Sequence, residues 1–125
     1  MSTVKAANLQ NTGSGAPTFQ NSSGTEIGQL ARAWVNFNGT GTPAIRDSFN
    51  VSSLTDQGQG DHQVNFTNAI GNANYCAQVS CGDPTDMDRF VIVHEVNTSY
   101  LRMRTFANSD ALRDLEVNCA TIFSD

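Results

Sequence analysis

Charge is scarce in this chain of 125 residues, and lysine is almost absent. Charged residues make up 15% of the sequence, and seven basic side chains face twelve acidic ones, for a formal net charge of −5. Lys5 is the single lysine. Proteins that bind duplex nucleic acid neutralise several phosphates with lysine and arginine, so this composition argues against nucleic acid as a partner.

Long apolar runs are also missing. No stretch approaches the roughly 18 apolar residues of a membrane-spanning helix, so we expect no membrane insertion. No charged segment followed by an apolar one opens the chain, which predicts synthesis in a cytosol without a secretory signal. No segment of useful length has apolar residues at the 3.6-residue period of a helix, which argues against a helical fold.

Residues with catalytic potential are few and poorly grouped. His62 and His94 lie outside any metal-binding spacing, which favours structural or solvated roles. Cys76, Cys81 and Cys119 are predicted to be free thiols that pack as small buried apolar groups. Cys76 and Cys81 point to opposite faces of one strand, which makes a disulfide between them geometrically poor. With no serine–histidine–aspartate order and no phosphate-binding loop, we expect no enzyme, no catalytic residue and no cofactor.

Two groups of aspartates deserve a separate interpretation. Asp56 and Asp61 flank a glycine-rich turn that resembles a calcium loop, but calcium needs six or more oxygen ligands. Hydrogen bonds within the turn are therefore the expected role of these two carboxylates. Asp83, Asp86 and Asp88 are more closely spaced in the sequence, and the same two roles, hydrogen bonding within a turn or binding of a metal ion, apply to them. We predict no metal site.

Alternating apolar residues are what the chain has in abundance. Such alternation, with a period of two, is typical of half-buried antiparallel strands. Turn-forming residues separate the runs at intervals of about ten residues, which predicts an all-β fold: an antiparallel β-sandwich or barrel-like domain over residues 29–125. The seven predicted strands lie at 31–37, 45–51, 62–66, 75–81, 90–96, 100–107 and 115–123. A helical turn or a surface loop is expected over 111–115.

The alternation assigns side chains to faces. Trp34 lies opposite Val35 and Phe37, and we expect it to pack in the core or an interface, with a sugar-stacking platform as the alternative. In strand 45–51, the side chains of Ile45, Phe49 and Val51 are predicted to share one face. In strand 90–96, one face is predicted to hold Phe90, Ile92 and His94, and the opposite face Val91, Val93 and Glu95.

An extended N-terminal arm is predicted for residues 1–28. It contains a degenerate repeat, in which the sequence Leu9–Ser14 (LQNTGS) recurs ten residues later as Phe19–Gly24 (FQNSSG). One large apolar residue per repeat cannot build a core, so we expect Leu9 and Phe19 to dock on a neighbouring subunit or assembly. A disordered linker is the alternative.

One strand also predicts a binding face. Tyr100, Arg102 and Arg104 share a side with Phe106, and they could bind a sugar or a carboxylate by stacking and bidentate hydrogen bonds. A solvated or intersubunit-paired face is the alternative. Asn-x-Ser/Thr triplets occur at Asn21, Asn38, Asn50, Asn65 and Asn97, and the asparagine-rich composition accounts for most of them.

Four motifs follow one another between Arg32 and Ile70. They are W-V-N-F-N-G-T-G at 34–41, I-R-x-S-F-N-V at 45–51, T-D-x-G-x-G-D at 55–61 and V-N-F at 64–66. This block resembles a module common in tail-fibre and related virion proteins of tailed bacteriophages. The flanking sequences G-T-E-I-G-Q-L-A-R-A-W and C-A-T-I-F resemble the flanks of such modules, so the resemblance covers most of residues 24–123. It implies a non-enzymatic, trimeric, β-rich virion component, assembled in the bacterial cytoplasm.

Two functional hypotheses follow from the resemblance. The first is a trimeric tail-fibre or spike component whose loops contact a host surface glycan, with the arm binding other virion proteins. The alternative is a capsid-bound decoration, cement or head-fibre protein. A glycan hydrolase would need two carboxylates about 5 to 10 Å apart in a cleft, and the dispersed acids give that hypothesis little support.

Overall fold

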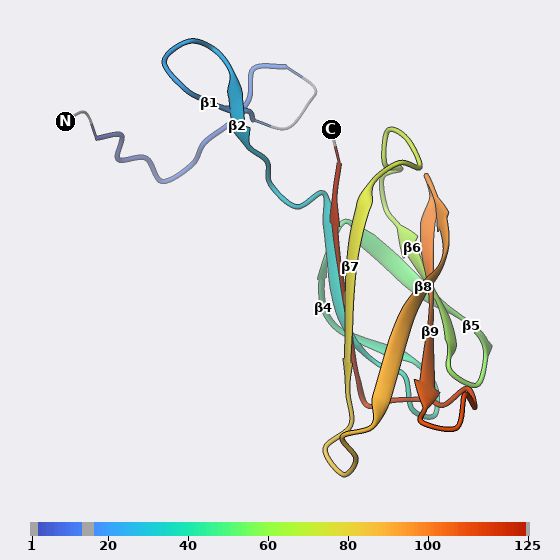
Figure 1. The fold of residues 1–125 in the computed structure, drawn as a ribbon. Coiled ribbons are helices and arrows are strands. Elements are labelled where there is room, and N and C mark those ends of the chain that lie inside the picture. Colours follow the sequence, from blue (N-terminus) through green and yellow to red (C-terminus); the bar gives the residue numbers. More distant parts are fainter. Residues whose placement is uncertain (1–2, 14–16, 125) are drawn as a thin grey trace. The chain divides into compact units, whose positions relative to one another are not determined.

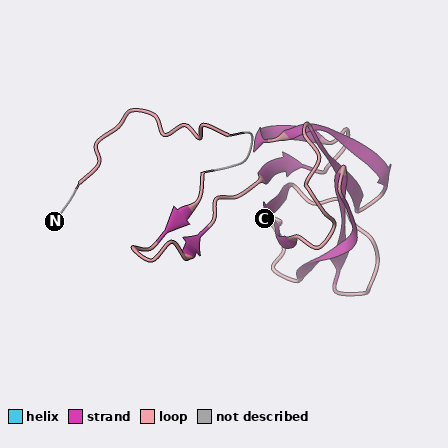
Figure 2. Cartoon of the chain, turned by 90° about the horizontal axis from the view of Figure 1, so that it is seen from above, coloured by secondary structure: helices cyan, strands magenta, loops and turns pink. Residues whose placement is uncertain are grey.

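A computed structural model describes residues 3–13 and 17–124 of the chain. It divides into two compact units, Met1–Leu30 and Ala31–Asp125. All regular structure in the described residues is β-strand, which confirms the all-β prediction (Figures 1 and 2). No helix in this part of the chain is long and apolar enough to cross a membrane.

The larger unit consists of two four-stranded antiparallel sheets. The first sheet has the order β4-β3-β10-β7, with strands Ala44–Phe49, Ala33–Asn38, Val117–Phe123 and Cys76–Gly82. The second sheet has the order β5-β6-β9-β8, with strands Val51–Gly58, Asp61–Phe66, Tyr100–Ala107 and Arg89–Asn97. Each sheet keeps two edge strands, so the described residues form no closed barrel and the arrangement is sandwich-like.

The two sheets share one apolar core. Successive side chains of a strand point to opposite faces, so every second residue of the central strands is buried between the sheets. The first sheet contributes Ala33, Val35, Phe37, Ala120 and Ile122, and the second contributes Val64, Phe66, Leu101 and Met103. The predicted inward faces of 31–37, 62–66 and 100–107 are confirmed by this burial.

Asn50 is the corner at which the chain passes from the first sheet to the second. Its φ of 56° is a left-handed conformation, which asparagine tolerates better than most residues. The side-chain amide donates to the carbonyls of Arg32 and Asn68 at 3.1 Å each, and the side-chain oxygen accepts the Asn68 N–H at 2.8 Å. The predicted strand 45–51 runs across this corner. The larger unit therefore has eight strands in its described part, where seven were predicted.

A β-bulge also corrects the predicted face of Ile45 and Phe49. Asp47 pairs with Asn36, whereas Ile45 pairs with the next residue of β3, so Arg46 is the extra residue of β4. The bulge reverses the alternation. Ile45 packs against the core, whereas Phe49 is 55% exposed on the outer side of the first sheet.

A second bulge changes the faces of β8. Val93 pairs with Met103 and Glu95 pairs with Arg102, which leaves His94 as the extra residue. Glu95 therefore lies on the outer face with Phe90 and Ile92, and the prediction that placed it with Val93 is wrong.

Residues 108–116 form a loop, so of the two predicted alternatives over 111–115 the surface loop is found. Leu115 is buried, but the last strand begins only at Val117. Two donors bind the Leu115 carbonyl: the Gly39 N–H at 2.9 Å and the Asn118 side-chain amide at 2.8 Å. The loop is thereby joined to the turn after β3.

The N-terminal unit contains one short hairpin, formed by β1 (Phe19–Gln20) and β2 (Glu26–Gly28) (Figure 2). An arm extended throughout is therefore not confirmed. Both copies of the repeat turn at their asparagine. Asn11 accepts the N–H two residues later at 3.3 Å, and Asn21 does the same at 3.0 Å. Ser14, the last residue of the first copy, lies outside the described residues.

Two glycines with nearly the same backbone provide a test of this fold. Gly60 (φ 64°) and Gly41 (φ 65°) are both left-handed. A Cβ at Gly60 would lie 2.5 Å from the backbone nitrogen of Arg113 and 2.6 Å from the backbone carbonyl oxygen of Thr105. No atom of the described residues lies within 4 Å of a Cβ at Gly41. We expect Gly41→Ala to lower the free energy of unfolding by about 1 to 2 kcal/mol through backbone strain alone. Gly60→Ala should lower it by at least about 2 kcal/mol more.

Urea unfolding of both variants measures this difference. Equal losses would contradict the close backbone packing of the turn at Gly60.

Candidate functional site

The outer side of the second sheet gathers most of the polar side chains predicted to bind a partner. We call it the polar face. Strand register places on it the outward residues Ser53, Thr55, Asp61, Gln63, Asn65, Phe90, Ile92, Glu95, Tyr100, Arg102, Arg104 and Phe106. Gln57, the bulge residue of β5, joins them through its hydrogen bond to Gln63.

Asp61 is the centre of the polar face. Its carboxylate accepts two hydrogen bonds from Arg102, through Nε at 2.6 Å and Nη2 at 2.8 Å, and one from Nε of Arg104 at 2.7 Å. Only 4% of the surface of Asp61 is exposed. The hydrogen bonds from Arg102, together with those from Arg104 and the charges of both guanidiniums, hold the pKa of Asp61 below its usual range despite its burial.

Local structure explains why one carboxylate reaches both arginines. Asp61 begins β6 directly after the tight turn at Gly60, and it pairs with Arg104 across the sheet. Arg102 lies two residues along β9 on the same face, within reach of a long side chain on the diagonal. The sequence predicted Asp61 as a turn residue, and this ion pair was missed. Asp61 and the arginines lie more than forty residues apart in sequence.

Tyr100 and Glu95 extend the network to the edge strand. The Tyr100 hydroxyl donates to Glu95 Oε1 at 2.6 Å, and Glu95 Oε2 lies 4.0 Å from Arg102 Nη1. The hydrogen bond to Glu95 raises the pKa of Tyr100. The structure thus brings the three predicted contact residues together, and it engages all of them with acidic neighbours. Arg104 keeps its terminal nitrogens without a partner among the described residues.

Amide side chains continue the network on the other half of the polar face. Gln63 donates to Asn65 at 2.7 Å, and Asn65 donates to Ser53 at 3.1 Å and to Thr55 at 2.9 Å. Gln57 donates to Gln63 at 3.4 Å. Polar residues at alternate positions of β5 and β6 were the sequence signal for this ladder. These side chains hold one another in place, so most of their hydrogen-bonding capacity is used within the protein.

A carboxyl group whose pKa is lowered by two guanidiniums is ionised at neutral pH, so Asp61 is unsuited to donate a proton as a general acid.

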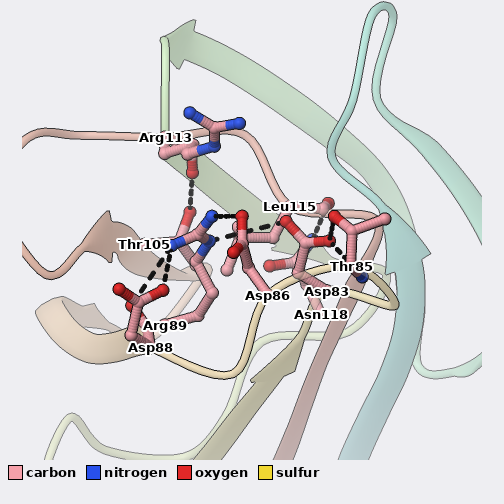
Figure 3. Close-up of polar contacts among 9 residues, drawn as sticks. All are labelled: Asp83, Thr85, Asp86, Asp88, Arg89, Thr105, Arg113, Leu115 and Asn118. Atoms are coloured by element: carbon pink, nitrogen blue, oxygen red, sulfur yellow. Dashed lines mark hydrogen bonds and ion pairs between the residues drawn. The ribbon is translucent and has the colours of Figure 1, made fainter.

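The acidic loop between β7 and β8 closes around a cation of the chain itself. Figure 3 shows the Arg89 guanidinium among three carboxylates: it lies 2.6 Å from Asp88, 3.5 Å from Asp83 and in contact with Asp86. Hydrogen bonds from the Thr85 hydroxyl and amide lower the pKa of Asp83, and Arg89 adds to the effect. No group of three or more histidine, cysteine or acidic residues within 3–13 and 17–124 is arranged to hold a metal ion.

Asp56 has the predicted turn role, because its side chain accepts the Gly58 N–H at 2.9 Å. Asn38 and Asn97, which open two of the Asn-x-Ser/Thr triplets, likewise accept the N–H two residues later, at 3.0 Å each. Turn geometry therefore explains these triplets.

The two histidines differ in environment. His62 is 1% exposed and packs edge-on against Phe37 at a ring distance of 5.3 Å, and its nearest acidic group is Asp114 at 4.0 Å. Neither ring nitrogen has a hydrogen-bond partner among the described residues. His94 is the exposed bulge residue of β8.

All three cysteines are free, as predicted, but their burial is lower than expected. Cys76 is exposed, and Cys81 and Cys119 are half-buried. Cys76 therefore contradicts the prediction of a buried thiol. Burial raises the pKa of Cys81, so this thiol stays protonated at neutral pH.

Trp34 and the two arm residues complete the predicted set. Trp34 is half-buried on the outer side of the first sheet, so the predicted core position is wrong, and the interface and platform interpretations stay open. Leu9 and Phe19 are 73% and 42% exposed, and both line a shallow groove within the N-terminal unit.

Asp61→Asn tests the centre of the polar face. Removing the charge leaves two arginines without their partner, so we expect the free energy of unfolding at pH 7 to fall by about 3 kcal/mol. A lowered folded pKa stabilises the protein above the unfolded value of about 3.9, and this contribution is lost as pH falls through the folded pKa. Between pH 7 and pH 2, the free energy of unfolding should therefore fall less in the variant than in the wild type, as measured by denaturation at each pH.

Asp56→Asn is the matched control, because an asparagine can still accept the Gly58 N–H. Equal stability and equal acid dependence of the two variants would contradict the assigned role of Asp61.

Comparison with known proteins adds no relative. The chain matches no protein-family model, no curated protein and no solved structure. The functional assignment therefore depends on the residues of this chain and on the motifs they form.

Proposed function

We propose that the chain is a structural protein of a tailed bacteriophage virion, a trimeric tail-fibre or spike component that contacts the host surface. The observation that carries the proposal is the continuous motif block from Trp34 to Phe66. Its four motifs resemble, in the same order, those of a module common in tail-fibre and related virion proteins.

The fixed residues of the motifs have backbone roles that fit a recurring structural unit. The first motif forms β3 and the turn at Asn38, the second forms β4 and the corner at Asn50, and the third and fourth form the turn at Gly60 and strand β6. A block that contains two hairpins and the passage between two sheets can keep its sequence while the loops around it vary.

The N-terminal unit provides the attachment in this proposal. Its described residues expose Leu9 and Phe19, and the groove beside them is lined by further apolar side chains, including Val4, Ile27 and Leu30. Exposed apolar side chains that gather in one place often mark a surface that binds another protein. We propose other virion proteins as the partners of this unit.

The exposed edge strand β8 supports association with further copies of the chain, and the number three is what the motif resemblance implies. An uncovered edge with apolar side chains invites pairing with another chain. Four of the exposed large apolar residues of the described chain lie on this strand: Phe90 (57%), Ile92 (45%), Val93 (37%) and Val96 (41%). A homotrimer would cover them.

The direct test is the position of the protein on intact particles, by gold-labelled antibody. Label on the tail or its appendages is expected. Label over the head would replace the fibre proposal with the alternative of a capsid-bound decoration or head-fibre protein. Particles without label would overturn both.

The subunit number has its own test. Light scattering of the full-length chain should give three times the mass of 13.4 kDa. Phe90→Asp should shift this mass toward that of the single chain, because the substitution places a charge in the proposed contact. A single-chain mass for the wild type would contradict the trimer.

A further inference from the structure

The outer side of the first sheet presents two aromatic rings. Trp34 on β3 and Phe49 on β4 are directly paired across the sheet and point away from the core. Phe49 is 55% exposed and Trp34 is half-buried. Exposed aromatic rings on neighbouring strands offer flat apolar surfaces that a ligand can stack on.

A groove lies beside these rings. It has a volume of about 410 Å³, within the usual range for small-ligand sites, and it is open to solvent. Thr121 of β10 pairs with Trp34 on one side and with Gln78 of β7 on the other, so Trp34 is the cross-strand neighbour of a residue that lines the groove. Its lining residues are Gln78, Val79, Ser80, Cys119 and Thr121.

The chemistry of the lining selects the ligand. Four of the five lining residues offer an amide, a hydroxyl or a thiol group, the fifth is Val79, and none carries a carboxylate, ammonium or guanidinium. Among these five residues a charged ligand would find no partner of opposite charge, whereas an uncharged polar ligand would find donors and acceptors. The charged residues Arg46 and Asp47 belong to β4, on the other side of β3 from the groove, and Arg46 donates to the Glu116 carbonyl at 2.8 Å. A neutral hexose has the matching parts, an apolar C–H face for the rings and hydroxyl groups for the groove.

We propose that Trp34, Phe49 and the adjoining groove form a binding site for a neutral saccharide chain. The inference rests on the proposed function only for the source of the saccharide, which is the host surface. The site lies on the opposite sheet from the polar face, whose carboxylates and arginines are engaged with one another.

A second copy of the chain is the less suitable occupant. Apart from its two rings and Val117, which is 36% exposed, this surface is polar, because Asn36, Asp47, Gln78 and Thr121 point outward. The exposed apolar residues that a self-contact would bury gather on β8 of the other sheet.

Trp34 is the only tryptophan of the chain, so its fluorescence reports on this site alone. The full-length protein is titrated with cellohexaose, maltoheptaose and mannohexaose, and with oligogalacturonate as a charged comparison. We expect at least one neutral oligosaccharide to shift the emission saturably and to protect Trp34 from acrylamide quenching. Oligogalacturonate should have no such effect.

Two matched variants assign the effect to the face. Phe49→Ala should weaken binding about tenfold or more, the usual consequence of removing an aromatic contact from the centre of a site. Met87→Ala removes a fully exposed apolar side chain from the loop between β7 and β8, outside both the proposed saccharide site and the proposed trimer contact, and should leave the affinity unchanged. Circular dichroism confirms that both variants are folded.

Three results would overturn the inference: no response to any of the neutral oligosaccharides, equal binding of oligogalacturonate, or equal weakening by the two variants. An emission shift that follows protein concentration without added saccharide would also overturn it, because self-association would then cover Trp34. Saccharide binding is measured on the purified chain, so its failure is distinct from a failure to find the protein on particles.

Discussion

Burial of one side of each four-stranded sheet in a common core is the constraint on which the rest of the structure depends. The inner residues of β3, β6, β9 and β10 supply this core, and strict alternation then directs every second side chain outward. Two outer faces result. The residues of these outer faces do not pack in the core, so the two faces can differ in chemistry. The proposed functions depend on that difference.

The two outer faces use their polar groups differently. On the second sheet, Asp61 holds Arg102 and Arg104, and amide side chains bind one another, so most hydrogen-bonding capacity is used within the protein. On the first sheet, Trp34 pairs with Thr121, which lines an open groove formed by uncharged side chains. The first sheet therefore offers a ligand site, whereas the polar face offers a rigid surface.

The sequence predicted strand periodicity well, because burial against a core leaves a repeating signal in each strand. The prediction failed where a single residue interrupts the alternation of side chains between the two faces of a strand. Asn50 turns the chain without a glycine, and the bulges at Arg46 and His94 reverse the alternation, which moved Phe49 and Glu95 to unexpected faces. The Asp61 ion pairs could not be predicted either, because they join β6 to β9 and depend on strand register, which a period of two does not encode.

The central claim is that the first sheet, and not the polar face, receives a ligand. Amide chemical shifts of the isotope-labelled full-length chain, recorded with and without cellohexaose, maltoheptaose and mannohexaose, test it most directly. The account predicts that the shifts caused by a binding oligosaccharide cluster on β3, β7 and β10 around Trp34 and Thr121. Shifts that cluster on β6 and β9 around Asp61 and Arg104 would contradict it.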